Sequence, residues 1–409
     1  MQTFFPAQLS ASAAGREAED ILRACVHCGL CNATCPSYLL ERNELDGPRG
    51  RIYLIKQMLE GHETSALTLH HLDRCLSCQS CETTCPSGVQ YHRLLDIGKA
   101  EVERRLPRPL PARLFRALLR AVMSRRQLTV PLMAMGRLFR PLLPAMLREH
   151  IPLLRPVISN PGRSYSRQVI LVQGCVQPAM SPTTNQAASR VLDALGISTV
   201  SVGAETCCGA LAYHGSGREQ GLAQARRNID AWWPQIEAGV EAIVMTASGC
   251  SNFVQDYAAL LADEPKYAGK ARRVSALLKD IAELLVEEDL EQLVLNSDTR
   301  ISWHCPCTAQ HGQKLDQATR SVLQRLGFEL PIVRDAHLCC GSAGSYSLLQ
   351  PSLAGALRER KLEALEASDP EQIVTANIGC QSHLAAATDR PVVHWIELVA
   401  RSLETTIEE

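Results

Sequence analysis

Eight cysteines near the start of the chain form two runs with the same spacing. In each run, three cysteines are separated by two residues, and a fourth follows three residues later, directly before a proline. The runs are Cys25, Cys28, Cys31 and Cys35-Pro36, and Cys75, Cys78, Cys81 and Cys85-Pro86. Three thiolates at these separations can wrap one face of an iron–sulfur cubane, which needs four thiolate ligands. The two runs therefore predict two [4Fe–4S] clusters.

The fourth cysteine of each run lies too far along the chain to complete the cluster of its own run. In the bacterial two-cluster ferredoxin pattern this cysteine ligates the other cluster. We therefore assign ligands in a crossed manner: Cys25, Cys28, Cys31 and Cys85 to one cluster, and Cys75, Cys78, Cys81 and Cys35 to the other. Zinc is the competing interpretation, but zinc ribbons use cysteine pairs with long spacers rather than a triplet followed by Cys-Pro.

The other cysteines form an internal repeat. The first half holds Cys175, Cys207, Cys208 and Cys250, and the second half holds Cys307, Cys339, Cys340 and Cys380. In both halves 32 residues separate the first cysteine from a Cys-Cys-Gly turn, and the last cysteine follows that turn by 42 or 40 residues. This agreement indicates a duplication. Cys305 has no counterpart in the first half.

Each half is predicted to fold as β-α-β-α-β. In the first half, apolar or β-branched runs at 169–172, 197–202 and 242–245 alternate with helical stretches at about 185–195 and 218–236. Strands separated by helices of this length imply a parallel sheet. Each cysteine position then lies just past the carboxyl end of a strand, where open α/β sheets build their sites. Four thiols should therefore converge in each half.

Four interpretations of these converging thiols stay open. A further iron–sulfur centre and a structural zinc ion both fit four thiolates. Thiol–disulfide chemistry fits cysteines at helix N-termini, where the thiol pKa is lowered. Buried structural cysteine is the fourth interpretation, and it does not explain why the repeat keeps all four positions. His304 and His311 lie near Cys307 and are candidates for outer hydrogen-bond donors.

A basic stretch connects the two cysteine-rich parts. Residues 104–155 contain twelve arginines, no lysine and one acid, Glu149, and are divided by several prolines. Leucines at 114 and 118 share one helical face, and arginines at 113, 116 and 120 lie on another. We therefore expect short basic amphipathic helices, which would either face a partner or lie on anionic lipid.

Composition and missing motifs narrow the function further. The net charge of −1 argues against nucleic acid as a partner, and 46% apolar residues are ordinary for a soluble protein. The N-terminus does not read as a signal peptide, so a cytoplasmic location is expected. The chain carries no glycine-rich nucleotide loop and no recognisable catalytic triad. We therefore expect no flavin or NAD and no catalytic residue of its own, and substrate oxidation in a partner.

The predicted fold class is multidomain α+β, with a helical di-cluster ferredoxin domain followed by two duplicated α/β domains with parallel sheets. An apparent helix at about 52–60 between the cysteine runs supports the helical first domain. The predicted domain ranges are 1–103 for the ferredoxin domain, 104–164 for the connector, 165–296 for the first Cys-Cys-Gly (CCG) domain and 297–409 for the second.

Together these motifs resemble the iron–sulfur subunits of bacterial glycolate oxidase. The resemblance extends to Asp46-Gly47-Pro48-Arg49-Gly50-Arg51, to the segment 228–234 and to His304-Cys305-Pro306-Cys307-Thr308. It implies a complex with two FAD-type flavoprotein subunits that oxidises glycolate to glyoxylate, and D-lactate as a secondary substrate. Electrons would pass through this chain to a quinone or other membrane acceptor, with peripheral contact of 104–155 on the cytoplasmic face of the inner membrane.

The wider group includes iron–sulfur subunits of lactate and glycerol-3-phosphate dehydrogenases and the heterodisulfide reductases, whose CCG domains hold non-cubane clusters. The heterodisulfide reductase motif ends in Cys-x-x-Cys, whereas Phe253 and His383 occupy the final position of that motif in the two halves of this chain. This departure keeps the ligand role of all eight CCG cysteines open. The alternatives are therefore a subunit of one of those dehydrogenases, or a redox catalyst that acts at the CCG domains.

Overall fold

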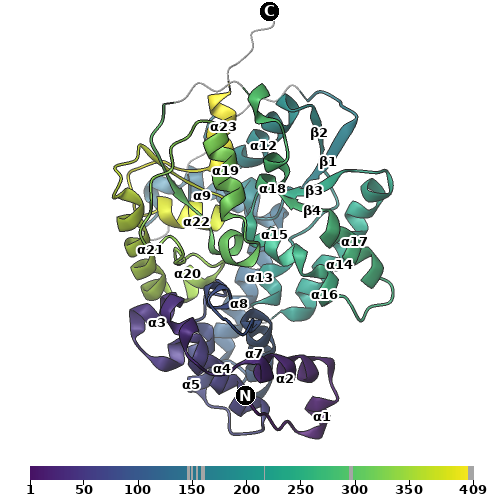
Figure 1. Ribbon diagram of the computed structural model, residues 1–409, viewed down its shortest axis with the longest axis vertical. Coiled ribbons are helices and arrows are strands. Elements are labelled where there is room, and N and C mark those ends of the chain that lie inside the picture. Colours follow the sequence, from purple (N-terminus) through teal and green to yellow (C-terminus); the bar gives the residue numbers. More distant parts are fainter. Residues whose placement is uncertain are drawn as a thin grey trace, which may run out of the picture. The chain divides into compact units, whose positions relative to one another are not determined.

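The computed structural model describes residues 1–144, 148, 151–152, 155–157, 162–215, 217–293 and 298–403. The chain divides into two compact units, each built from two segments (Figure 1). The first unit consists of Met1–Ala117 and His337–Lys361, and the second of Leu118–Ala336 and Leu362–Glu409.

The first unit is helical and holds both N-terminal cysteine runs. Leu22, Ile55 and Leu94 are fully buried in its core. Pro48 begins the helix predicted between the runs, at a position where the missing proline N–H breaks no helical hydrogen bond. Its elements are α1 (Ala7–Ser10), α2 (Ala13–Ala24), η1 (Leu30–Thr34), α3 (Pro36–Glu41), η2 (Glu44–Asp46), α4 (Pro48–Leu59), α5 (Ala66–Asp73), α6 (Ser80–Thr83), α7 (Tyr91–Arg105) and α20 (Tyr346–Leu349). The helical prediction for this part is confirmed.

The second unit contains two parallel sheets. The first has the strand order β2-β1-β3-β4, and the second has the order β5-β6-β7. The strands are β1 (Arg167–Leu171), β2 (Ile197–Val200), β3 (Ala242–Met245), β4 (Leu278–Asp280), β5 (Ile301–His304), β6 (Gln372–Thr375) and β7 (Val392–His394). The β-α-β-α-β prediction for the first half is confirmed, and β4 is an additional strand.

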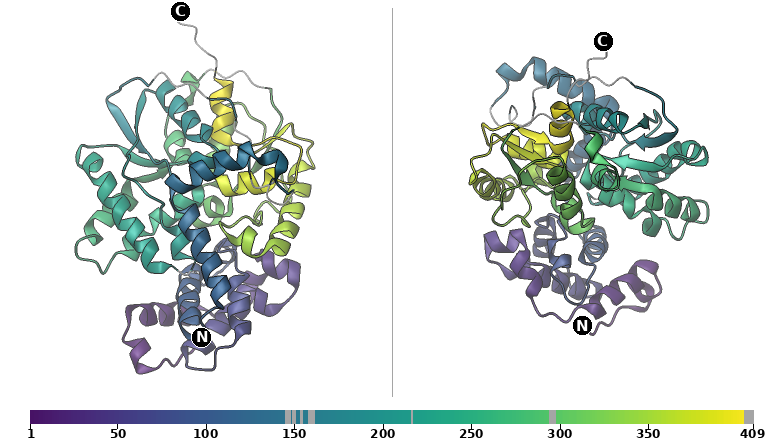
Figure 2. Two further views of the ribbon diagram at one scale, coloured as in Figure 1. Left: turned by 180° about the vertical axis from the view of Figure 1, so that it is seen from behind. Right: turned by 45° about the horizontal axis from the view of Figure 1, so that its top comes forward.

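Alternation along the strands explains how the first sheet is covered on both faces. Val169 and Leu171 pack into one core with α12 (Thr183–Ala194), whereas Ile170 packs into another with α14 (Arg218–Glu237). Figures 1 and 2 show helices on both sides of this sheet. The further helices of this unit are α9 (Arg126–Leu138), η3 (Arg140–Leu142), α11 (Gln177–Met180), α13 (Ala210–Tyr213), α15 (Ser248–Gln255), α16 (Tyr257–Leu260), α17 (Ala268–Leu277), α18 (Ile281–Val286), η4 (Leu290–Gln292), η5 (Thr308–Gly312), α19 (Asp316–Arg325), α22 (Ile378–Ala385) and α23 (Trp395–Ser402).

The prediction that the second half repeats all three strands was wrong. Residues 328–333, which correspond to β2, have no strand assignment. Pro331 lies in the middle of this segment and has no N–H to donate to a neighbouring strand. The second sheet does contain β7 beside β6, in the place that β4 takes beside β3 in the first sheet.

The basic connector forms helices, as its periodicity predicts, and these are α8 (Leu110–Met123) and α9. α21 (Pro351–Glu366) and α8 each continue from one unit into the other along the chain. Most of the connector arginines described are engaged within the chain. Arg116 pairs with Asp73, Arg120 donates to the carbonyl oxygen of Gly215, and Arg155 pairs with Glu397. Across the described residues, no helix is both long and apolar enough to span a membrane.

A buried histidine at the end of β7 makes the stability of the second unit depend on pH. His394 accepts a hydrogen bond at Nδ1 from the backbone N–H of Ile396, so in the neutral ring Nε2 carries the proton and donates to the carbonyl oxygen of Thr246, 2.8 Å away. Burial lowers the pKa of His394 to about 4, from an ordinary 6.5. The unfolded chain therefore binds a proton between these two values that the folded chain does not, and acid favours unfolding.

We expect the free energy of unfolding to fall by about 1.4 kcal/mol per pH unit from this residue as the pH drops from 6.5 toward 4. His394→Asn keeps a side-chain acceptor at the start of α23 but does not titrate, so its pH slope should be shallower by that amount. Urea unfolding followed by tryptophan fluorescence would measure it, because all four tryptophans lie in the second unit. His62→Asn, at an exposed site, is the control. Equal slopes in wild type and His394→Asn would contradict the prediction.

Candidate metal centres

The two N-terminal cysteine runs adopt the same local backbone. His27 and Gly29 in the first run have φ of 60° and 86°, and Ser77 and Gln79 at the equivalent places in the second have φ of 53° and 60°. Left-handed residues on either side of the middle cysteine curl each run into a tight loop. The repeated spacing in the sequence therefore produces a repeated shape.

The structure brings Cys85 to the first run. Cys25, Cys28, Cys31 and Cys85, which we call the first cysteine set, line one cavity. Burial, and after it the charges of the neighbours Cys25, Cys85 and Cys28, together raise the pKa of the Cys31 thiol to about 11. Four thiols that disfavour one another's ionisation in this way are stabilised as thiolates only when they share a cation.

In the same way, the structure brings Cys35 to the second run. Cys35, Cys75, Cys78 and Cys81, the second cysteine set, line another cavity. Burial raises the pKa of the Cys81 thiol well above its ordinary value, and the charges of Cys78, Cys75 and Cys35 add to that effect. Both sets thus offer four converging sulfur atoms, which is the donor set of an iron–sulfur cubane.

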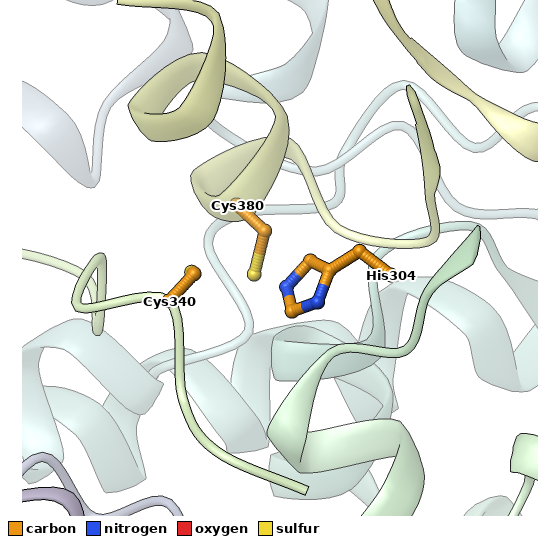
Figure 3. A group of neighbouring side chains, drawn as sticks. All are labelled: His304, Cys340 and Cys380. Atoms are coloured by element: carbon orange, nitrogen blue, oxygen red, sulfur yellow. The ribbon is translucent and has the colours of Figure 1, made fainter. Parts of the chain in front are cut away.

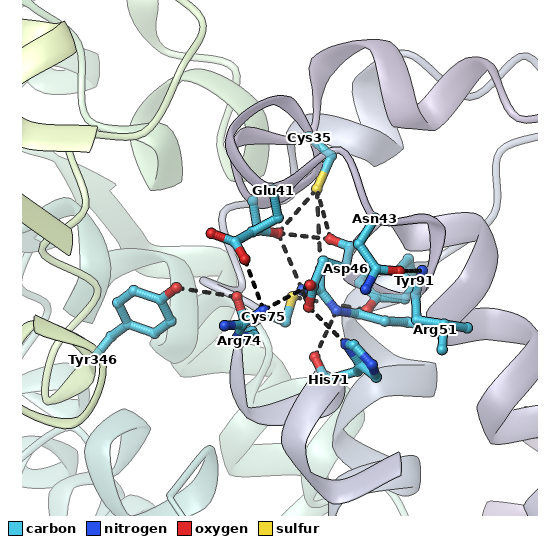
Figure 4. A network of polar contacts seen from close by, with 12 residues as sticks. Cys35, Glu41, Asn43, Asp46, Arg51, His71, Arg74, Cys75, Tyr91 and Tyr346 are labelled. Atoms are coloured by element: carbon cyan, nitrogen blue, oxygen red, sulfur yellow. Dashed lines mark hydrogen bonds and ion pairs between the residues drawn. The ribbon is translucent and has the colours of Figure 1, made fainter. Parts of the chain in front are cut away.

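A buried polar network surrounds the second set (Figure 4). Arg51 is 1% exposed and Asp46 is fully buried. The Arg51 guanidinium donates to the carbonyl oxygen of His71 and to Ser37 Oγ, and its Nη1 lies 4.0 Å from Cys35 Sγ. The hydroxyl of Tyr91 donates to Cys75 Sγ over 3.7 Å. Sequence reasoning recognised Asp46 and Arg51 only as part of a motif and did not predict this network.

The first CCG half also gathers its cysteines. Hydrogen bonds link the thiols of Cys175 and Cys207, of Cys207 and Cys208, and of Cys208 and Cys250. Cys175 and Cys208 both donate to Cys207, with Cys175 having the larger effect, and these hydrogen bonds lower the pKa of Cys207 well below its usual value. The sheet therefore brings together four thiols that are separated by up to 75 residues in the sequence.

Two features fix the CCG turn of this half. Gly209 has φ of 104°, and a Cβ atom there would lie 2.6 Å from the carbonyl oxygen of Gly221 on α14, so no other residue fits. Asn228, 1% exposed on the same helix, accepts from the backbone N–H of Thr206 and donates to the carbonyl oxygen of Cys207. Asn228 is a structural residue of the turn that its sequence context alone does not identify.

The CCG turn of the second half has the same geometry. Gly341 has φ of 93°, and a Cβ atom there would lie 2.5 Å from the carbonyl oxygen of Ala354. Its N–H donates to Cys339 Sγ over 3.4 Å, just as the N–H of Gly209 donates to Cys207 in the first half. Cys339 and Cys340 are both buried and belong to the first unit.

The second unit holds the other two cysteines of this half, Cys307 and Cys380. A ring nitrogen of His304, at the end of β5, lies within 4.8 Å of Cys380 Sγ on α22 (Figure 3, which also labels Cys340). His304 was expected only as an outer donor, yet it is placed as a candidate ligand. His311 is buried in η5, and burial raises the pKa of the Cys305 thiol well above its ordinary value, with the charge of Asp316 adding to it.

Phe253 and His383, which stand where heterodisulfide reductases have their last cysteine, are both buried. Phe253 packs its ring against Tyr213 and Tyr257. The first half thus has an aromatic cluster where that motif would have a thiol.

Fold and thiol geometry together define a class of protein. A family model of a 4Fe-4S dicluster domain matches residues 21–89, and a model of a cysteine-rich domain matches 169–255 and 301–385. The chain is therefore an iron–sulfur protein with a helical dicluster domain followed by a duplicated cysteine-rich domain.

Similarity over the full length identifies the family. The glycolate oxidase iron-sulfur subunit of Escherichia coli K12 is 54% identical over 99% of this chain and 100% of its own length. The probable glycolate oxidase iron-sulfur subunit of Bacillus subtilis 168 is 29% identical over 91% of this chain and 90% of its own. The chain belongs to the family of glycolate oxidase iron–sulfur subunits.

A solved structure supports the fold alone. The crystal structure of a hypothetical protein from Helicobacter pylori matches with a TM-score of 0.53 at 11% identity, over 98% of this chain and 74% of that one.

Proposed function

We propose that this chain is the electron-transfer subunit of a glycolate oxidase complex. It would carry electrons from a flavin-containing subunit that oxidises glycolate to glyoxylate, with D-lactate as a secondary substrate, to a quinone-type acceptor. The observation that carries the proposal is the convergence of two four-thiol sets in one small helical unit of a chain from this family. In this proposal the ferredoxin domain spans 1–103, the connector 104–164, and the two CCG domains 165–296 and 297–409.

The two cysteine sets would each hold a [4Fe–4S] cluster in the crossed arrangement. When bound, such clusters supply one-electron carriers of tunable potential. The protein's part is to supply thiolates on rigid loops and to exclude water around them. Each set takes cysteines from both runs, and this crossed arrangement keeps the two sets close together. Cys81 accordingly lines the first cavity as well as the second.

Access to the first set supports exchange of electrons with a partner protein. Cys28 is the one exposed cysteine among all seventeen, each of which is described. Its neighbours Val26 and Leu30 are 69% and 54% exposed. A flavoprotein subunit could therefore approach this sulfur directly, and an exposed apolar surface of this kind suits a protein contact.

The CCG cysteines would hold additional iron–sulfur chemistry. For the first half, the thiol contacts from Cys175 through Cys207 and Cys208 to Cys250 support a further centre. In the second half, the turn at Cys339 and Cys340 has the same backbone geometry as its counterpart. A second candidate function is thiol-based redox catalysis at these domains, which the lowered pKa of Cys207 favours. Burial of Cys207 at 2% exposure argues against direct contact with a large substrate.

One experiment tests the proposed function and separates it from the alternative. The anaerobically purified chain is mixed with its flavoprotein partners, and glycolate is added while the EPR signals of reduced iron–sulfur clusters are recorded. We expect reduction only when the flavoprotein is present. Reduction of a disulfide by the dithionite-reduced chain alone, faster than by dithionite without the chain, would favour the redox catalyst. Failure of glycolate to reduce the complete mixture would overturn the proposal.

The connector would lie on an anionic membrane near the acceptor. Since most of its arginines are engaged within the chain, the support now comes from α9 and η3. Apolar residues spaced by three or four positions form an exposed face, which we call the α9 face. Its members, between 43% and 81% exposed, are Leu128, Leu132, Met135, Phe139 and Leu142. Arg125 and Arg126, at the start of the helix, are exposed as well.

We expect the double variant Leu132→Glu/Met135→Glu to weaken binding to vesicles containing anionic phosphatidylglycerol by about tenfold or more, because two apolar side chains no longer enter the lipid and two acids repel it. Flotation of the full chain would measure the bound fraction. Leu67→Glu, at a site 53% exposed outside the connector, is the matched control. Equal flotation of both variants, or no flotation of the wild type, would rule out this surface.

A further inference from the structure

Arg51 places a full positive charge inside the protein next to the second cysteine set. Its guanidinium reaches Cys35 Sγ at 4.0 Å, and it also interacts electrostatically with Cys75. A guanidinium keeps its proton at every accessible pH, so the charge of Arg51 is fixed, and Asp46 lies 3.6 Å from it as a counter-charge.

The carboxylate of Asp46 balances this charge but does not face the sulfur atoms alone. One oxygen contacts His71 Nδ1 at 2.8 Å and Arg51 at 3.6 Å, and the other accepts from Arg74 at 2.8 Å. Asp46 thus divides its negative charge among several donors, whereas Arg51 points one of its N–H groups at Cys35 (Figure 4). Arg51 thus contacts a sulfur atom of this set, at 4.0 Å from Cys35 Sγ, while the negative charge of Glu82 acts on Cys81 at another edge of the same cavity.

The arginine beside the first set lies in a different environment. Arg49, on the same helix α4, interacts with Cys31 but has a side chain 35% exposed that pairs with Glu44 at the surface. Solvent and this partner screen most of its field, whereas Arg51, at 1% exposure, is shielded from solvent. The two cysteine sets therefore share a ligand pattern but differ in the charge that the protein holds next to them.

We propose that Arg51 is a positioning residue that sets the reduction potential of the second site by holding a fixed positive charge beside Cys35 and Cys75. This inference rests on the proposed pair of clusters. An electron that arrives at the second site adds one negative charge there and takes up no proton, so its energy falls with every positive charge nearby. Arg51 makes that reduction easier than the same four thiolates would alone, and Tyr91 adds a hydrogen bond to Cys75 in the same sense.

The test is a redox titration of the full chain, with each site followed by EPR. In Arg51→Gln, the ratio of reduced to oxidised second site at the wild-type midpoint should fall by about tenfold or more, because one buried charge at this distance contributes at least that much. The first site should change far less. Arg49→Gln, the control from the same helix, should leave the second site unchanged. Arg51→Lys, which keeps the charge, should restore most of the potential.

Asp46→Asn gives a prediction of opposite sign. It removes the balancing carboxylate and leaves Arg51 in place, so the second site should become easier to reduce. If Arg51→Gln does not retain iron, this variant decides the question. A purely structural role would move the iron content but not the two potentials in opposite directions. Iron-replete variants with unchanged midpoints would overturn the inference, whereas a wild-type protein that binds no iron would overturn the proposed function itself.

Discussion

Cys35→Ala is expected to empty the second cysteine set and to leave the first one filled, although Cys35 belongs to the first run in the sequence. Its sulfur interacts with Cys81 of the second run, and it lines the cavity of that run. Losing one of four thiolates normally costs a cubane its stability. Iron and acid-labile sulfide per chain should drop by about four each, the content of one cubane.

The reciprocal variant makes the result decisive. Cys85→Ala should remove the first cluster by the same amount, because Cys85 interacts with Cys25 and Cys31. EPR of the reduced variants would then show which site survives in each. Cys305→Ala, at a cysteine outside both sets, is the control and should leave the N-terminal iron unchanged. If Cys35→Ala instead lost the site built on Cys25, Cys28 and Cys31, each run would ligate its own cluster.

Much of the fold could be predicted because local pattern and burial agree. The runs at 169–172 and 242–245 are continuous and apolar, which is typical of strands covered on both faces, and they form β1 and β3. The spacing of the cysteines then fixed their place at one edge of the sheet. The lost strand at 328–333 was harder to foresee, because one proline outweighed an otherwise β-like segment and the repeat argued for a strand.

The chemistry around the thiols was less predictable. Asp46, Arg51 and His71 come from different elements, and only tertiary packing brings them together. Local sequence cannot distinguish a buried arginine from an exposed one, since Arg49 and Arg51 lie two residues apart in the same motif. His304 is a similar case, because its distance to Cys380 depends on how β5 and α22 pack.

The arginines of the connector show the limit of reading charge from composition. A run of twelve arginines favours a solvated or lipid-facing surface. Arg137 donates to the carbonyl oxygens of Pro152 and Ala179, and Arg140 donates to that of Ile151, so both serve the fold. The pattern did predict short amphipathic helices correctly, because the spacing of apolar residues can be seen in the local sequence.

Asn228→Ala should lower the free energy of unfolding of the second unit by about 3 kcal/mol, because it leaves several buried polar groups without partners. The side chain of Asn228 binds Thr206, Cys207 and the hydroxyl of Tyr257. Tyr257 in turn donates to the carbonyl oxygen of Cys208, so one amide holds both cysteines of the CCG turn. Urea unfolding followed by tryptophan fluorescence would measure the loss.

The same variant should also expose the turn, which a general loss of stability would not do under native conditions. The reaction of Cys207 and Cys208 with a thiol reagent should become faster without denaturant, since the turn loses its anchor to α14 while the sheet persists. Asp230→Ala, two residues along α14 at a surface site bonded to Tyr267, is the matched control and should change neither quantity by much. If Asn228→Ala unfolded at the wild-type urea concentration, the turn would be held by Gly209 and its backbone contacts alone. The side-chain amide of Asn228 would then not determine the geometry of the four thiols.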